Sequence, residues 1–110
     1  MTIKRITAIV PVQMLKPLEK HLRTCGVPGV TVEHVKGYGE HPNYFRRDLM
    51  QANARVVLYA EDNDVETIVA AVTRCATEAG TQAGILAVET IDRLVHLPSG
   101  EDVSRPLSTQ

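Results

Sequence analysis

Residues 54–79, ARVVLYAEDNDVETIVAAVTRCATEA, contain the clearest structural signal in the chain. The run 54–60 is mostly apolar and contains the adjacent valines Val56 and Val57, which predicts a strand. An acidic cluster follows at 61–64, and Asn63 with Glu66 three residues later resembles a capping box that starts a helix. Apolar side chains then recur at helical spacing: Val65, Ile68, Val69, Val72 and Ala76. This pattern predicts a strand followed directly by an amphipathic helix.

The beginning of the chain shows the same order. Residues 3–10 form a short β-branched run, and Pro11 is expected to end the strand because proline cannot donate a ladder hydrogen bond. A helical pattern comes next, with Pro17 placed in its first turn, where a missing N–H costs nothing, and Gly26 at its end. Its apolar positions are Leu15, Leu18, Leu22 and Cys25.

Further strands are predicted at 30–35 and, as a last strand or strand pair, at 85–88 and 91–97. Residues 40–53 have neither period and predict a long loop of the kind that is usually functional. The resulting order, βαββαβ, is the α+β ferredoxin-like arrangement: a four-stranded antiparallel sheet with two helices on one face. We expect one domain over residues 1–97, and a polar C-terminal tail, 98–110, that frays. The sheet's open face is expected to be buried against copies of the chain.

Composition is consistent with this interpretation. The chain has 110 residues, 44% hydrophobic and 23% charged, with a net charge of -1, which suits one globular domain and gives no general attraction to nucleic acid. No apolar run approaches the roughly 18 residues of a membrane span, and no signal peptide is expected. The two cysteines, Cys25 and Cys75, lack CxxC spacing and predict buried, reduced thiols in a cytoplasmic protein.

Residues 30–39, VTVEHVKGYG, resemble the PII (nitrogen regulatory P-II) signalling proteins, in which the second strand runs into a lysine-glycine-aromatic-glycine motif before a long loop. Residues 4–10, 61–76 and 94–101 extend the resemblance over nearly the whole chain. The resemblance implies a homotrimer with a nucleotide cleft between subunits, a loop that engages a target protein, and no catalytic role.

The resemblance also implies which residues contact the ligand, an adenine nucleotide such as ADP, AMP or ATP. The matching positions are Gly29, Thr31, Gly37, Tyr38, Gly39 and Gly84. The sequence departs from the family pattern at residues 78–85, which contain no lysine, and at His96 and Pro98, where the family has phosphate-binding arginines. Each lost charge-assisted contact is worth about 1.5–3 kcal/mol, so we expect weakened triphosphate binding, a ligand with fewer phosphates, or no nucleotide.

The predicted loop combines aromatic and guanidinium side chains of the kind that protein interfaces favour: Tyr44, Phe45, Arg46 and Arg47. The alternative is that Phe45 and Leu49 pack under a neighbouring subunit. The loop is shorter than is usual in the family and lacks the context of the modified tyrosine. In this it resembles a divergent branch linked to heavy-metal efflux, whose target would be a membrane transporter.

Metal binding is the alternative function. His41, beside Glu40, offers an imidazole for a divalent ion, while the competing interpretation is a solvated loop histidine. His21 and Cys25, four residues apart, share a helix face, where a buried thiol beside a boundary histidine is favoured over a metal pair. No catalytic group is expected, because the acids at 61–64 suit a helix start better than acid–base chemistry. A trimeric module that binds a partner without any small ligand is a third possibility.

Overall fold

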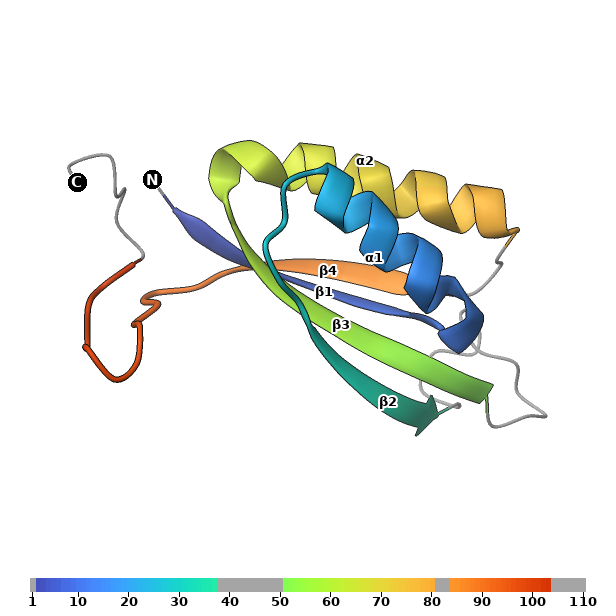
Figure 1. Ribbon diagram of the computed structural model, residues 1–110, viewed down its shortest axis with the longest axis horizontal. Coiled ribbons are helices and arrows are strands. Elements are labelled where there is room, and N and C mark those ends of the chain that lie inside the picture. The colour runs from blue at the N-terminus through green and yellow to red at the C-terminus, as the bar shows by residue number, and fades with distance from the viewer. Residues whose placement is uncertain (1, 38–50, 81–83, 104–110) are drawn as a thin grey trace.

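The computed structural model describes residues 2–37, 51–80 and 84–103 (Figure 1). Its elements are β1 (Ile3–Pro11), a 3-10 turn η1 (Val12–Met14), α1 (Leu15–Thr24), β2 (Thr31–Gly37), β3 (Gln51–Glu61), α2 (Asp62–Ala79) and β4 (Ile85–Thr90).

The four strands form one antiparallel sheet in the order β2-β3-β1-β4. Both helices lie over the same face of the sheet (Figure 1). This arrangement confirms the predicted α+β ferredoxin-like βαββαβ fold. The central strand β1 pairs over its whole length with residues 53–61 of β3, and β2 and β4 form the two edges.

The core lies between the sheet and the helices. Alternate side chains of a strand point to opposite faces, so Ile6, Ala8 and Val10 share the helix-facing side of β1 and are buried. They pack with the predicted apolar stripes of the helices and with the inner side chains of β3. The remaining members of this buried cluster are Met14, Leu18, Leu22, Val27, Val56, Leu58, Val65, Ile68, Val72 and Cys75.

The limits of α2 differ slightly from the prediction. The helix begins at Asp62 with Glu61 as its N-cap, so Asn63 lies within the first turn and is not the cap. Asp62 and Asp64 carry negative charge in that turn, where it interacts favourably with the helix dipole. At the other end Gly80 adopts φ 69°, a left-handed conformation that glycine accommodates without steric cost.

The predicted loop at 40–53 is too long at its C-terminal end. β3 begins at Gln51, where Gln51 pairs with Gly37 of β2, and Asn53 pairs with Pro11 of β1. Asn53 is buried, with 2% of its surface exposed, so strand pairing continues into the polar sequence that lacked a strand-like pattern. The rest of the predicted loop lies outside the described residues.

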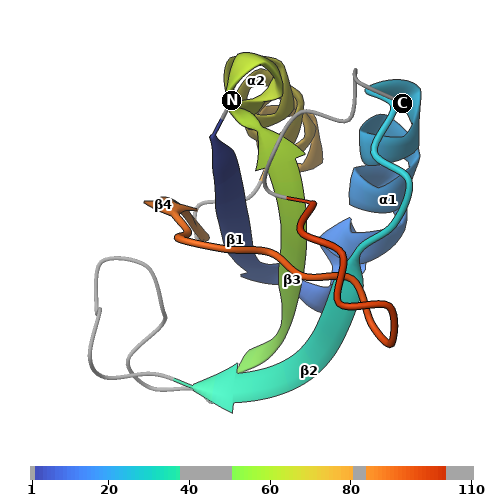
Figure 2. The same cartoon turned by 90° about the vertical axis from the view of Figure 1, so that its left-hand side faces the viewer.

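The prediction of strand structure over 91–97 is also wrong. β4 ends at Thr90, and the chain then forms a turn in which only Val95 and Asp102 make an isolated bridge. Backbone N–H groups of His96 and Val103 donate to the carbonyl oxygens of Glu101 and Leu94, each at 2.8 Å. The predicted boundary between domain and tail, at 97/98, falls inside this C-terminal turn. Figure 2 views the molecule from the end where the turn lies.

Candidate functional site

The sheet face opposite the helices is crossed by rows of side chains from neighbouring strands. Strand register places directly paired residues on the same face, so each row can be read from the pairing. Three rows of this open face are Tyr59–Arg5–Glu89, Thr31–Val57–Thr7–Ala87 and Glu33–Arg55–Ile9–Ile85. The face therefore alternates charged rows with a row of small or apolar side chains.

The charges of the open face are paired across strands. Arg5 Nε and Nη2 donate to Glu89 Oε1 at 2.9 and 2.6 Å. The Glu89 carboxylate is the main reason that the pKa of Arg5 is raised, and Tyr59 adds to the effect. Arg55 Nε lies 2.8 Å from Glu33 Oε1. Paired in this way, the charged rows present little net charge, which suits contact with another protein surface better than attraction of a free ion.

Four of the predicted ligand-contacting residues belong to the described part of the chain. Gly29 precedes β2, Thr31 and Gly37 are the first and last residues of β2, and Gly84 stands directly before β4. Because β3 and β1 lie between the two edge strands, the β2 and β4 edges are about 14 Å apart. Within one subunit, Gly29 and Thr31 therefore lie close together at the β2 edge, while Gly84 lies apart from them at the β4 edge. Tyr38 and Gly39 lie outside the described residues.

Gly84 packs closely against the backbone of β1. A Cβ built on it would lie 3.2 Å from the carbonyl oxygen of Ile9, and its φ is 149°. Both features favour glycine at this position. The requirement for glycine at residue 84 therefore has a structural origin within one subunit, whatever the residue binds.

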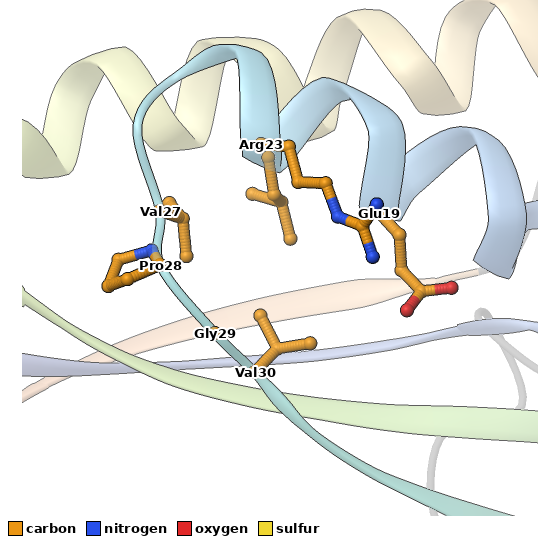
Figure 3. A pocket seen from close by; sticks show the side chains of 7 residues that line it. Glu19, Arg23, Val27, Pro28, Gly29 and Val30 are labelled. Carbon is orange, nitrogen blue, oxygen red and sulfur yellow. The ribbon is translucent and has the colours of Figure 1, made fainter.

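A cavity of about 240 Å³ lies between the C-terminal half of α1 and the connection to β2 (Figure 3). Gly29 is the one predicted site residue that lines it. The others are Glu19, Leu22, Arg23, Val27, Pro28 and Val30, none of which sequence reasoning identified as binding residues. The turn chemistry of Val27-Pro28-Gly29 marked the connection, but no sequence pattern shows that the helix and the turn stand far enough apart to leave a hollow.

The predicted metal-binding residues are only partly described. His21 Nδ1 lies 2.8 Å from the Pro17 carbonyl oxygen, and its Nε2 lies 3.4 Å from Glu78 Oε1 on α2. Cys25 is half-buried against the core. Within the described ranges, no three histidine, cysteine or acidic side chains could hold a metal ion. His41 and the predicted partner-binding residues Tyr44, Phe45, Arg46 and Arg47 lie outside those ranges.

Neither helix of the described chain is long and apolar enough to span a membrane.

Comparison with known proteins agrees with this geometry. The family model for "Nitrogen regulatory protein P-II" matches residues 3–97. The chain is similar to nitrogen regulatory protein P-II 2 of Methanothermobacter thermautotrophicus, with 26% identity over 105 residues, covering 89% of this chain and 91% of that protein. Its fold is similar to a crystal structure of Arabidopsis thaliana PII bound to citrate, with a TM-score of 0.76 and 22% identity over 92% of this chain and 88% of that one. This match extends from the first residue of β1 to beyond the end of β4, and the chain belongs to the nitrogen regulatory protein P-II family.

Proposed function

We propose that this protein is a homotrimeric sensor that binds an adenine nucleotide between subunits and controls a target protein through the loop before β3. Proteins of this family are regulators and not enzymes, in agreement with the absence of catalytic residues expected from the sequence. The observation that carries the proposal is the separation of the two sheet edges. Ligand residues at β2 and at the start of β4 can meet only if the β2 edge of one subunit faces the β4 edge of another.

The open face supports the same assembly. Its apolar members Ile9, Val57 and Ile85 are half-buried in the single chain, while its charged rows are already paired. A second copy covering this face would remove apolar surface from water without leaving an unpartnered charge. Light scattering after size exclusion tests the assembly directly, and a monomer mass at micromolar concentration would contradict the proposal.

The effector is tested by calorimetric titration with ATP, ADP and AMP in low-salt buffer. Because the segment 78–85 lacks a lysine and Pro98 stands where the family has an arginine, we expect ADP or AMP to bind at least as well as ATP. A strong preference for ATP would show that other basic groups have replaced the missing ones. If none of the three nucleotides binds to a confirmed trimer, the result would favour a module that binds its partner without a small ligand.

The loop is the proposed partner-binding segment, with Tyr44, Phe45, Arg46 and Arg47 as the contact residues. Effector binding would select one loop state and so favour or prevent contact with the target. Limited trypsin digestion between Arg46 and Arg47 reports on this step. Protection by a bound nucleotide is expected, and equal cleavage with and without a nucleotide that binds would contradict ligand control of the loop.

The short loop also supports assignment to the divergent branch linked to heavy-metal efflux. In this interpretation the protein acts in the cytoplasm, its target is a membrane transporter, and His41 contributes to binding of a divalent metal ion. Titration of zinc and copper into the wild type and His41→Ala tests the assignment, with His34→Ala as a matched control because His34 is an exposed strand histidine. Equal binding by wild type and His41→Ala would remove His41 from the proposal.

A further inference from the structure

The cavity beside α1 combines an apolar floor with a charged rim. Leu22 and Val27, which are 2% and 8% exposed, belong to the core and form the floor together with half-buried Val30. Leu22 and Val27 show only a small part of their surface in the cavity, and Val30 is the most exposed of the three. A small aliphatic group placed there would contact Val30 and the accessible edges of Leu22 and Val27, and part of its surface would leave water.

The rim consists of Glu19 and Arg23, one helical turn apart on α1. Figure 3 shows the Arg23 side chain running along α1 toward Glu19, so that the guanidinium and the carboxylate lie on the same side of the cavity, across from Val27 and Pro28. Charges four residues apart on a helix commonly pair with each other. Here they do not, and within the described residues neither side chain forms a hydrogen bond or an ion pair.

We infer that this cavity binds a zwitterionic aliphatic α-amino acid. The ligand's carboxylate would accept hydrogen bonds from Arg23, its ammonium group would donate to Glu19, and its side chain would lie on Leu22, Val27 and Val30. A ligand with only a carboxylate would face the like charge of Glu19, and a ligand with only an ammonium would face Arg23. A molecule with both charges and an apolar side chain satisfies rim and floor together.

This inference goes beyond the proposed nucleotide sensor and does not depend on it. The cavity lies within one subunit, between α1 and residues 27–30, and shares only Gly29 with the residues expected to contact the nucleotide, whose site needs a second subunit. Its wall leads directly into β2, which begins at Thr31. A bound amino acid would thus link α1 to the start of the strand that leads into the partner-binding loop.

Titration of the full-length protein with L-leucine, followed by calorimetry and by amide chemical shifts, tests the site. We expect saturable shifts at residues 27, 29 and 30. The analogues 4-methylpentanoate, which lacks the ammonium, and 3-methylbutylamine, which lacks the carboxylate, should each bind about tenfold more weakly or worse. Leucine should also bind better than glutamate, whose second carboxylate does not suit the apolar floor. Analogues that bind as well as leucine would overturn the inference.

Matched variants test whether leucine binding depends on the two rim side chains and not on charges elsewhere on α1. Arg23→Gln and Glu19→Gln should each weaken leucine binding by about tenfold. Lys20→Gln removes a charge from an exposed position on the same helix that does not line the cavity, and should bind leucine as the wild type does. Unchanged binding in both rim variants, or no shifts at residues 27–30, would overturn the inference. Competition between leucine and ADP would show that the two ligands share a site and would also overturn the inference. A protein that binds leucine but not ADP would contradict only the nucleotide proposal.

Discussion

Two glycines of the proposed ligand region differ in how well their positions would tolerate a side chain. Gly84 has φ 149° and backbone oxygen 3.2 Å from a built Cβ, whereas a Cβ on Gly29 meets no atom within 4 Å. We therefore expect Gly84→Ala to lower the free energy of unfolding by about 1–3 kcal/mol and Gly29→Ala to change it by less than about 0.5 kcal/mol. Urea denaturation of both variants measures this difference. Equal losses would show that the backbone near residue 84 relaxes readily.

The Cys75 thiol on α2 is 1% exposed, and its burial raises its pKa, with a smaller contribution from the Glu78 carboxylate. Because the unfolded chain then ionises at lower pH than the native protein, the stabilising contribution of the thiol is complete below its ordinary pKa of about 8.5 and is lost as pH rises through the native value. The stability advantage of the wild type over Cys75→Ala should therefore shrink in alkaline buffer. Urea denaturation at neutral and alkaline pH measures it, and a constant difference would contradict the prediction.

At the scale of elements, the start of α2 depends on its negative charges. Asp62 lies in the first turn, and its Oδ1 is 3.6 Å from Lys4 Nζ on β1. Asp62→Asn removes both the helix-dipole interaction and this half-exposed ion pair, which should cost about 0.5–1 kcal/mol of unfolding free energy. Glu66→Gln, a carboxylate beyond the first turn, is the matched control and should be nearly neutral. Equal effects in thermal or urea denaturation would exclude a special role for the first turn.

The order of the elements was predictable because hydrophobic periodicity is a local property. Apolar stripes predicted both helices, and short apolar runs, β-branched in the case of residues 3–10, predicted the central strands. The ends of the elements were harder to predict, because pairing with Pro11 of β1 and Gly37 of β2 extends β3 to Gln51 through a polar stretch. Residues 91–97 place apolar Ile91, Leu94, Val95 and Leu97 among polar residues, yet only Val95 finds a bridging partner within the described chain. Strand formation there depends on a neighbour that the local sequence does not specify.

The candidate site was predictable only where it follows one segment. Thr31 and Gly37 could be placed on the predicted strand and Gly29 just before it, but the distance between β2 and Gly84 depends on the strand order of the whole sheet. The cavity rim is harder still to predict, because in the sequence Glu19 and Arg23 look like any two solvent-exposed charges one turn apart on a helix.

At the scale of the whole molecule, assembly through the open face can be tested by reversing one charge pair. Arg5→Glu would set a carboxylate beside Glu89, and burial of two like charges is costly. We expect the single variant to lose trimer mass in light scattering and the double variant Arg5→Glu/Glu89→Arg to recover it. A trimer that is equally stable in the single variant would place the Tyr59–Arg5–Glu89 row outside the interface.

The position of β2 and β4 at opposite edges also has a genetic consequence. If each effector site combines the β2 edge of one subunit with the β4 edge of the next, a copy damaged only at Thr31 and a copy damaged only at Gly84 can complement each other. Each variant alone would form rings without any functional site. In a ring that contains both, one junction joins the undamaged β2 edge to the undamaged β4 edge. Two inactive alleles expressed together in one cell would then restore part of the signalling, and neither would do so alone.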